Sequence, residues 1–379
     1  MAAASLHDDA DFAKQRHDSH SPVSHLDKDA DRVNLLLSLR GRTVHVPSLD
    51  YLTQHWPKKT NGELNNMRED VSYWLKSTIP PGKALDAFLD SDFGLFGATW
   101  WPCASFEQLR IVTYLAVWLF TWDDEIDISE GAMWNDFDEA QRYRDQTLAY
   151  VRFALGLDAV DQVVHHPIIL NFKPIGEAIR HRYDIFRREI VYQEMAFYME
   201  TSETEQRIRL SGRIPTVTEF WDFRLGSSAV GVCLALNEFS WDSMSLPADV
   251  YADDDVKTMF KCTNTIICAV NDLLSVKKEI KRDAVDSLLP ILYFRTGDIQ
   301  AAVTDVVTFL EEEVRTFDAA AESFLQKYCA SPIELQNDIR DFVDGCKQYV
   351  TGNLSWSLET NRYGVSHAQD GSGNISIVL

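Results

Sequence analysis

The sequence predicts an all-α protein, built as a single-domain helical bundle around a central apolar cavity. Apolar residues recur at helical spacing along most of the chain, as at Ile111, Leu115, Trp118 and Ile126. Strand signals are weak, because β-branched residues rarely alternate with polar ones and no Asn-Gly turn joins two apolar runs. No shift in composition divides the chain, so we expect its helices to pack into one domain.

The helical pattern is clearest in six segments, each expected to be a helix: 111–127, 177–200, 216–240, 256–281, 299–328 and 332–360. Inside the third of them, the Gly-Ser-Ser sequence at 226–228 indicates a helix break. We expect the domain to occupy residues 41–365. Residues 1–40 are expected to be disordered, because the first 30 of them are polar, and residues 366–379 are expected to form a mobile tail.

The composition excludes several classes of partner. A net charge of −22 argues against nucleic acid and anionic membrane surfaces. The chain shows no signal peptide, and no apolar stretch reaches the ~18 residues of a membrane span. The six cysteines show no zinc spacing and are expected to be reduced core residues, and the histidines at 7, 17, 20 and 25 are too irregular for a metal site. We therefore expect a soluble cytoplasmic protein, with a monomer and a homodimer both left open.

A first acidic cluster ends the apolar run TYLAVWLFTWDDEID. Asp123 and Asp127 are four residues apart, and Asp124 and Asp127 are three apart. Residues at these spacings lie on one face of a helix, so two carboxylates can converge and bridge hard cations. Alone, the cluster could equally be a solvated helix end.

A second cluster follows the apolar run TIICAV. Asn271, Ser275 and Glu279 step by four residues twice and place three oxygen donors along one helix face. Magnesium prefers oxygen ligands and usually completes its shell with water and phosphate oxygens. Together the two clusters predict a cavity mouth that gathers several divalent cations around a diphosphate. A third acidic run, at 253–255, lacks an apolar lead-in and is interpreted as a solvated helix start.

With these motifs the chain resembles the class I terpene synthases, in particular fungal sesquiterpene cyclases that make caryophyllane- or presilphiperfolane-type skeletons. The family carries a DDxxD-type motif, matched here by Asp123, Asp124 and Asp127, and an NDxxSxxxE motif, matched by Asn271, Ser275 and Glu279. Four further residues match its landmarks: Arg224, Lys278, Arg362 and Tyr363. The matches run in order from about residue 95 to 363 and cover most of the chain.

The resemblance implies roles for these residues. The two motifs would bind Mg²⁺, with three ions expected, and Arg224, Lys278, Arg362 and Tyr363 would donate hydrogen bonds to the diphosphate. The family couples diphosphate sensing to a helix break, where Ser227 and Ser228 occupy the linker and effector positions. An ordinary kink with capping serines is the structural alternative.

The cavity wall is predicted by stepping back along each helix from its metal motif. On the first helix these positions are Ala116, Leu119 and Phe120, and on the second they are Asn264, Ile267 and Cys268. Trp356 shares a face with Tyr363, and Phe220 is a weaker candidate. Phe120 and Trp356 match cavity aromatics of the family, although an aromatic at helical spacing can also be plain core.

The predicted function is magnesium-dependent ionisation and cyclisation of an allylic prenyl diphosphate, with farnesyl diphosphate as the expected substrate and a cyclic sesquiterpene as the product. A geranyl or geranylgeranyl diphosphate cyclase is the first alternative. A chain-elongating prenyltransferase is disfavoured, because such enzymes normally carry two aspartate-rich motifs and the second motif here is of the Asn/Ser/Glu type. A squalene-synthase-like coupling enzyme is similarly disfavoured. A non-catalytic isoprenoid-binding helical protein would not need a complete set of magnesium ligands.

Overall fold

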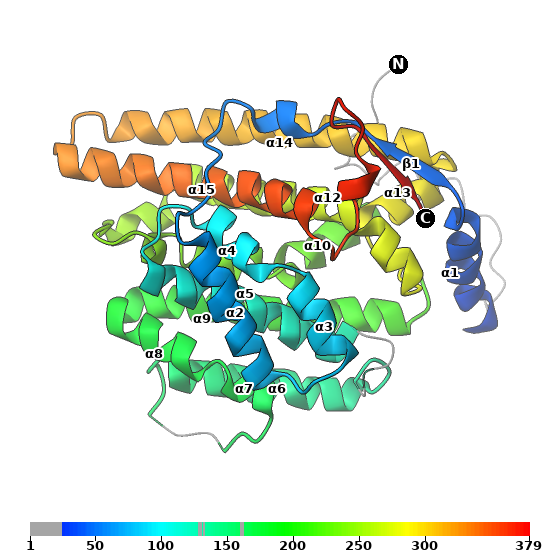
Figure 1. Ribbon diagram of the computed structural model, residues 1–379, viewed down its shortest axis with the longest axis horizontal. Helices are drawn as coiled ribbons and strands as arrows, with labels where there is room; N and C mark the ends of the chain where they lie inside the picture. Colours follow the sequence, from blue (N-terminus) through cyan, green and yellow to red (C-terminus); the bar gives the residue numbers. More distant parts are fainter. Residues whose placement is uncertain (1–24, 128–130, 132, 160–162) are drawn as a thin grey trace.

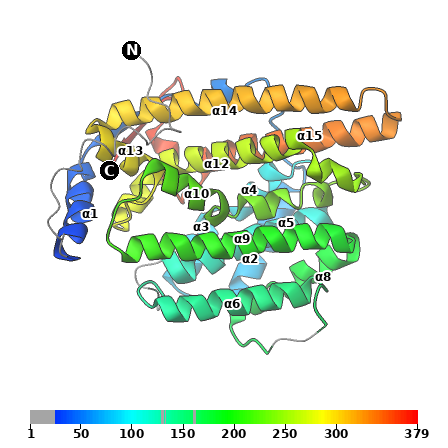
Figure 2. The same cartoon turned by 180° about the vertical axis from the view of Figure 1, so that it is seen from behind.

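Long helices lie side by side in layers and make up most of the molecule (Figure 1). The computed structural model describes residues 25–127, 131, 133–159 and 163–379. Helices α14 (Ile299–Lys327), α12 (Asp254–Lys281) and α15 (Ile333–Glu359) form one side, and α9 (Ile185–Leu210) and α6 (Phe137–Ala154) form the other, as the reverse view in Figure 2 also shows. Helix α5 (Phe106–Asp127) lies between these two sides. The predicted all-α bundle is therefore confirmed.

Shorter elements complete the described chain. The helices are α1 (His25–Leu39), α2 (Leu64–Thr78), α3 (Lys83–Asp90), α4 (Phe93–Trp100), α7 (Pro167–Leu170), α8 (Lys173–Arg182), α10 (Val217–Ser227), α11 (Val230–Leu234) and α13 (Leu288–Thr296). Four 3₁₀ turns are η2 (Asp50–Thr53), η3 (Glu238–Ser240), η4 (Ala248–Ala252) and η5 (Ser366–Ala368). No helix in this part of the chain is long and apolar enough to cross a membrane.

The predicted helices agree with the structure at three of the six segments to within about two residues, namely α12, α14 and α15. The first segment, 111–127, is extended N-terminally to Phe106. The helix predicted over 177–200 is wrong, because α8 ends at Arg182 and a new helix starts at Ile185. Asp184 starts it by accepting a hydrogen bond from the backbone N–H of Arg187, an N-cap that the periodicity alone did not reveal.

Helix α5 is anchored by two tryptophans just before its acidic end. Trp118 is fully buried, and its Nε1–H donates to the carbonyl of Ile168 at 2.7 Å. Trp122 is also fully buried and donates to the hydroxyl of Thr147 at 2.9 Å. Because both indoles are fixed by packing and a hydrogen bond, the turn that follows them is held in one orientation. That turn carries Asp123, Asp124 and Asp127.

The segment predicted as one helix over 216–240 is broken, as the Gly-Ser-Ser sequence indicated. A capping box between Thr216 and Glu219 starts α10, which ends at Ser227. Ala229 then takes a left-handed conformation with φ of 56°, and α11 starts in a new direction at Val230. Gly226 permits close packing on α9, since a Cβ there would lie 2.3 Å from the Thr201 hydroxyl.

The two ends of the described chain are joined by a short sheet. β1 (Thr43–Val46) pairs antiparallel with β2 (Ile375–Val378), with Thr43 opposite Val378. The mobile tail predicted over 366–379 is therefore wrong, because alternate residues of β2 are buried and its backbone is paired with a strand more than 300 residues earlier.

The predicted disorder of residues 1–40 is wrong for the part that α1 occupies. Its Leu35 and Leu39 are buried, and Arg32 pairs with Asp286 at 2.5 Å. The apolar run VNLLLSL at 33–39 supplies the buried face of this helix, but the partners of the helix lie far away in the sequence. Residues 1–24, with His7, His17 and His20, lie outside the described residues.

The cysteines are all free, as predicted. Cys233, Cys262, Cys268 and Cys346 are buried, whereas Cys103 and Cys329 are exposed, so the core assignment holds only for the first four. The acidic run at 253–255 does start a helix, because Asp253 caps α12 by accepting from the N–H of Asp255. It is not simply solvated, since Lys327 bridges Asp253 and Asp255.

Candidate active site

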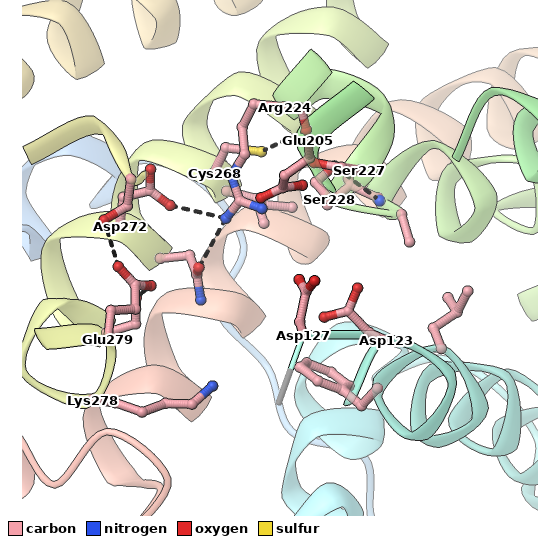
Figure 3. Close-up of a pocket in the computed structure, with 18 of the residues that line it drawn as sticks. Asp123, Asp127, Glu205, Arg224, Ser227, Ser228, Cys268, Asp272, Lys278 and Glu279 are labelled. Atoms are coloured by element: carbon pink, nitrogen blue, oxygen red, sulfur yellow. Dashed lines mark hydrogen bonds and ion pairs between the residues drawn. The ribbon is translucent and has the colours of Figure 1, made fainter. Parts of the chain in front are cut away.

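A cavity of about 260 Å³ opens between α5, α9, α10, α12 and the chain after α15. Its polar end is lined by both predicted metal motifs, and its opposite end is lined by aromatic and aliphatic side chains. In Figure 3 the carboxylates of Asp123 and Asp127 point across the pocket toward Glu205 and Arg224, and the amine of Lys278 points into it from α12. Two clusters that are about 150 residues apart in the sequence therefore face one cavity.

The α5 wall carries carboxylates that are poorly compensated. Burial and the nearby carboxylates of Glu205 and Asp124 raise the pKa of Asp123 to about 7. Burial and the charge of Asp123 raise the pKa of Asp127 to about 7. Glu205 on α9 also has its pKa raised to about 7, by burial and by Asp127. Three acidic groups therefore repel one another across one part of the pocket.

Cations approach this wall without forming close pairs. Arg282 and Arg362 lie 3.8 and 3.9 Å from Asp124, and Arg209 lies 3.8 Å from Asp127. These separations exceed the range of a charge-assisted hydrogen bond. Tyr198 donates to Asp123 at 3.1 Å. The negative charge on the α5 wall is thus only partly balanced by the protein.

The α12 wall, by contrast, is closely hydrogen-bonded. The amide oxygen of Asn271 accepts from Arg224 at 3.0 Å, and its Nδ2 donates to the hydroxyl of Tyr363 at 2.7 Å. Glu279 accepts from the hydroxyls of Ser275 and Ser287. The three oxygen ligands predicted for the second metal motif are therefore hydrogen-bonded to protein groups in this structure.

Asp272, which the motif spacing does not single out, orients Arg224. Its carboxylate is almost fully buried, lies 2.9 Å from Arg224 and accepts from the backbone N–H of Leu288 at 2.8 Å. Burial alone would lower the pKa of Arg224, but the charge of Asp272 keeps that pKa well above its usual value. Arg224 is therefore a fixed, charged donor facing the cavity.

The helix break places two serines beside this arginine. Ser227 and Ser228 both line the cavity, and the Ser228 hydroxyl donates to Asn264 at 2.9 Å. Asn264 in turn donates to the carbonyl of Leu225 at 2.6 Å. The prediction that Asn264 lines the cavity is wrong, because its amide lies behind the wall and holds the end of α10 instead.

The four predicted diphosphate ligands converge on the same cavity, which they line from α10, α12 and the segment after α15. Burial and the charges of Arg362 and Arg282 lower the pKa of Lys278 to about 7. Arg362 lies over the ring of Phe120, 4.9 Å from its centroid. The side chain of Arg362 is only 9% exposed. The carboxylates of the opposite wall and the aromatic ring cover it.

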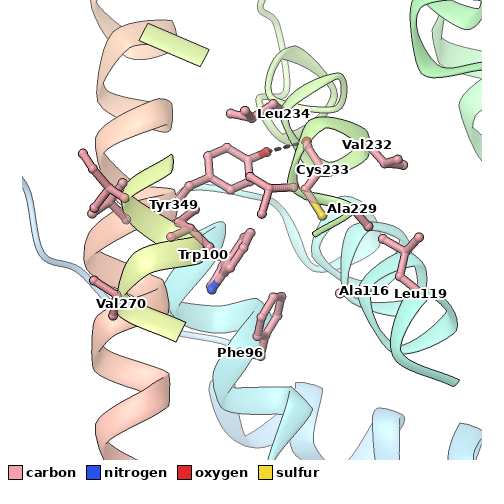
Figure 4. Packing of buried hydrophobic residues seen from close by; sticks show 14 of the residues in the cluster. Phe96, Trp100, Ala116, Leu119, Ala229, Val232, Cys233, Leu234, Val270 and Tyr349 are labelled. Atoms are coloured by element: carbon pink, nitrogen blue, oxygen red, sulfur yellow. Dashed lines mark hydrogen bonds between the residues drawn. The ribbon is translucent and has the colours of Figure 1, made fainter. Parts of the chain in front are cut away.

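The apolar end is built from aromatic rings that contact one another. Phe96 meets the ring of Trp356 edge-on, with centroids 5.0 Å apart, and Phe120 lies 6.0 Å from Trp356. The remaining predicted wall residues line this cavity too: Ala116, Leu119, Phe220, Ile267 and Cys268. Figure 4 shows Phe96 and Trp100 of α4 facing Ala116 and Leu119 of α5 across the packed interior. Trp356 is fully buried and donates to the carbonyl of Ser91 at 2.9 Å, so it is core and cavity wall at once.

Several cavity residues had not been identified from the sequence. Glu205 lies in the polar stretch TSETEQ, which reads as an exposed helix face until α9 is packed against α5 and α10. Phe96 and Trp100 lie in the apolar run FGLFGATWW, which signals a buried helix but not which cavity it faces. Other missed lining residues are Trp134, Tyr198, Arg209, Cys233, Arg282, Asp286, Ser287 and Asn353.

The donor set fits a hard divalent cation. Partly buried carboxylates with raised pKa values face the cavity, and the opposite wall supplies amide, hydroxyl and carboxylate oxygens. Among the described residues, no three His, Cys, Asp or Glu side chains form a metal centre by themselves. A few carboxylates on two facing walls, without a complete cage of protein ligands, are what Mg²⁺ requires. This ion commonly uses one or two protein carboxylates and takes its other ligands from water and phosphate.

Comparisons with known proteins agree with this geometry. Residues 114–316 match the family model described as terpene synthase family 2, C-terminal metal binding. The chain is 31% identical over 344 residues to the sesquiterpene cyclase hepA of Aspergillus oryzae, covering 88% of this chain and 93% of that protein. It is 28% identical over 316 residues to the germacrene A synthase of Nostoc punctiforme, covering 81% and 93%. A solved variant of cucumene synthase has a similar fold, with a TM-score of 0.68, 22% identity and coverage of 81% and 98%.

Proposed function

Because the chain belongs to the terpene synthase family and has its class I fold, we propose that it converts farnesyl diphosphate to a cyclic sesquiterpene in a magnesium-dependent reaction. The observation that carries this proposal is a single cavity with two ends. One end holds both oxygen-donor motifs and four hydrogen-bond donors for an anion, and the other is lined by aromatic rings. An allylic diphosphate has the same division into an anionic head and an apolar chain.

Mg²⁺ would be held by Asp123, Asp124 and Asp127 on one wall and by Asn271, Ser275 and Glu279 on the other, with three ions as the expected number. When bound, it would supply Lewis-acid stabilisation of the negative charge that develops on the departing diphosphate. For the α12 wall to contribute, Asn271 and Glu279 must exchange some of their present hydrogen bonds, with Arg224 and with Ser275 and Ser287, for new partners.

The protein's own cations would bind and orient the diphosphate. Arg224 is held by Asp272, and its planar fork suits phosphate oxygens. Burial and the neighbouring arginines lower the pKa of Lys278 to about 7. An arriving diphosphate would raise that pKa again and favour the protonated, positively charged amine. The hydroxyl of Tyr363 accepts a hydrogen bond from Asn271, so this contact connects the groups that would bind the diphosphate to the second metal motif.

The apolar end would fold the hydrocarbon chain and protect the carbocation from premature capture. Aromatic faces stabilise a nearby cation by roughly 0.5–2 kcal/mol each, which favours one position without trapping it. Phe96, Phe120 and Trp356 contact one another, so their rings present a fixed shape to the chain. The shape of this wall selects which carbon atoms meet.

The chain length of the substrate is part of the proposal. Two of its relatives are a sesquiterpene cyclase and a germacrene A synthase, which supports a C15 substrate. Geranyl and geranylgeranyl diphosphate remain the alternatives, and a chain-elongating prenyltransferase is a more distant one. A cytoplasmic location and a monomeric or homodimeric state also belong to the proposal.

The test is incubation of the protein with the C10, C15 and C20 allylic diphosphates and Mg²⁺, with and without isopentenyl diphosphate. Released diphosphate and extracted products are measured in parallel. We expect fastest release with the C15 substrate and cyclic C15 products. Consumption of isopentenyl diphosphate with formation of longer chains would indicate elongation, and no release with any substrate would indicate a binding protein.

A further inference from the structure

The loop between α12 and α13, residues 282–287, forms part of the cavity mouth and follows the second metal motif in the chain. It lines the cavity with Arg282, Ala284, Asp286 and Ser287. The Ser287 hydroxyl donates to Oε2 of Glu279 at 2.5 Å, and the backbone N–H groups of Arg282 and Ala284 donate to the Glu279 carbonyl. The position of the Glu279 carboxylate therefore depends on where this loop lies.

The backbone of this α12–α13 loop needs support from outside it. Asp283 takes a left-handed conformation with φ of 60°, which is uncommon for a residue that carries a Cβ. Such a conformation persists only where surrounding contacts hold it. Conformational entropy also opposes a single position for six connecting residues. A contact that holds one loop side chain from a distant element would supply this support.

Helix α1, which lies beside α13 at one end of the molecule, supplies such a contact (Figures 1 and 2). The Nη1 and Nη2 atoms of Arg32 donate to the two carboxylate oxygens of Asp286, each at 2.5 Å. The two side chains are only 14% and 13% exposed. Nη1 also donates to the carbonyl of Arg213, between α9 and α10, at 3.3 Å. A bidentate pair of this kind fixes the relative geometry of its partners.

A second arginine reaches the same loop but does not hold it as firmly. Arg40, one residue beyond the end of α1, donates to the carboxylate of Asp283. These side chains are 48% and 67% exposed, so water and salt screen the pair and it contributes little. One region of the chain therefore makes a buried contact and an exposed contact with one loop, and their effects can be compared directly.

We propose that Arg32 is a positioning residue: by holding Asp286 it fixes the α12–α13 loop, and through Ser287 it orients Glu279 for Mg²⁺ and the diphosphate. This inference rests on the proposed function. Oε2 of Glu279 can keep its bond to Ser287, while Oε1, now bonded to Ser275, is the oxygen available to an ion. Loss of a hydrogen-bonding partner of a ligating carboxylate typically weakens metal binding by about 10–100-fold. Arg32 acts two contacts further out, so we expect the lower end of this range.

The first test is calorimetric titration of inorganic diphosphate into the protein at a saturating concentration of Mg²⁺. Arg32→Ala removes a positive charge and Asp286→Ala removes a negative one. If the two residues acted only through their charges, the first variant would bind the anion more weakly and the second more tightly. A positioning role predicts that both variants bind it about tenfold more weakly than the wild type. Changes of opposite sign would overturn the inference.

The double variant Arg32→Ala/Asp286→Ala shows whether the two residues act through one contact. Either single substitution already breaks that contact, so the double variant should bind diphosphate no more weakly than each single variant. Losses that add would contradict the inference. The double variant also leaves neither charge without its partner, so circular dichroism should show the wild-type helical content.

Arg40→Ala is the matched control, because it removes the exposed contact with the same loop. Its affinity for diphosphate should stay within about twofold of the wild type. A loss equal to that of Arg32→Ala would show that the buried pair has no special role. If the wild type with Mg²⁺ binds no diphosphate, the proposed function fails instead.

A second measurement follows the loop itself and needs neither metal nor turnover. The N–H of Leu288, at the end of the loop, donates to Asp272 at 2.8 Å, so its hydrogen exchange reports whether the loop is in place. Exchange across residues 282–288 of the metal-free protein should be about tenfold faster in Arg32→Ala than in the wild type, and unchanged in Arg40→Ala. Equal protection in all three proteins would refute the positioning role and leave the proposed function standing.

Discussion

The two walls that carry the predicted metal motifs differ in how the protein satisfies them. On α12, Asn271 and Glu279 are bonded to Arg224, Tyr363, Ser275 and Ser287. On α5, Asp123 and Asp127 face Glu205 and one another, and burial together with these charges raises the pKa of both aspartates to about 7. One wall is closed by hydrogen bonds, and the other has an excess of negative charge.

This difference indicates separate contributions to stability and to cation binding. A carboxylate whose pKa is higher in the folded than in the unfolded protein destabilises the fold when it is ionised. For Asp123 the loss of folding stability grows as the pH rises from about 3.8, the ordinary pKa, to about 7, the pKa in the folded protein, and it is complete above pH 7. A divalent cation would remove that cost on the α5 wall. The α12 wall differs in that its oxygen ligands are hydrogen-bonded to protein partners, although burial and the charge of Asp272 also raise the pKa of Glu279.

Removal of divalent metal should have the largest effect. Both walls supply only oxygen donors, so excess chelator should reduce diphosphate release to background, and Mg²⁺ should restore it, with Mn²⁺ as a partial substitute. The melting temperature should also rise when Mg²⁺ and a diphosphate are added together. Full turnover in chelator would contradict the assignment of both motifs.

Asp123→Asn should reduce turnover by about 10²–10³-fold, the range seen when one stabilising group for developing charge is lost. Without metal, however, the variant should melt at a higher temperature than the wild type near pH 8, because it removes one of the mutually repelling charges. Thermal unfolding in chelator measures this. A lower melting temperature would show that the α5 carboxylates are balanced by the protein after all.

Asn271→Ala should reduce turnover by a similar factor but should destabilise the metal-free protein. It removes a partner from both Arg224 and Tyr363, and each lost buried hydrogen bond costs about 1–3 kcal/mol. Circular dichroism should still show a helical fold. If Asn271→Ala and Asp123→Asn shift the melting temperature in the same direction, the contrast between the walls is wrong.

Arg362→Lys should have a smaller effect on turnover, about tenfold. It keeps the positive charge near Asp124 but loses the planar fork that suits phosphate and the contact over Phe120. The Michaelis constant and the turnover number should be measured together. A Lys variant with wild-type kinetics would mean that Arg362 acts only as a point charge.

Phe120→Leu should change products more than rate. The ring of Phe120 lies beside Phe96 and Trp356, and its loss removes one cation-stabilising face worth roughly 0.5–2 kcal/mol. More acyclic or monocyclic product should therefore escape, with a turnover number within about tenfold of the wild type. An unchanged product profile with a large drop in melting temperature would make Phe120 a plain core residue.

The helical class and the positions of both motifs can be predicted from the amino-acid sequence alone. The helical spacing of apolar residues predicted the bounds of α12, α14 and α15 to within about two residues, because each of these helices buries a continuous stripe of apolar side chains. The spacing of Asp123 with Asp127, and of Asn271 with Ser275 and Glu279, fixed each set on one helix face. These features are local, so neighbours in the sequence contain the information.

Which side chains meet in the cavity depends on how the helices pack against one another. The burial of Glu205, the pairing of Asp272 with Arg224, and the placement of Asn264 behind the wall depend on how α9, α10 and α12 cross. Strand β2 pairs with a segment more than 300 residues earlier, and α4 packs closely on α15 only because residue 352 is glycine. Such contacts join residues that are distant in the sequence. Their hydrogen bonds and burial exist only once the chain has folded, so no local pattern records them.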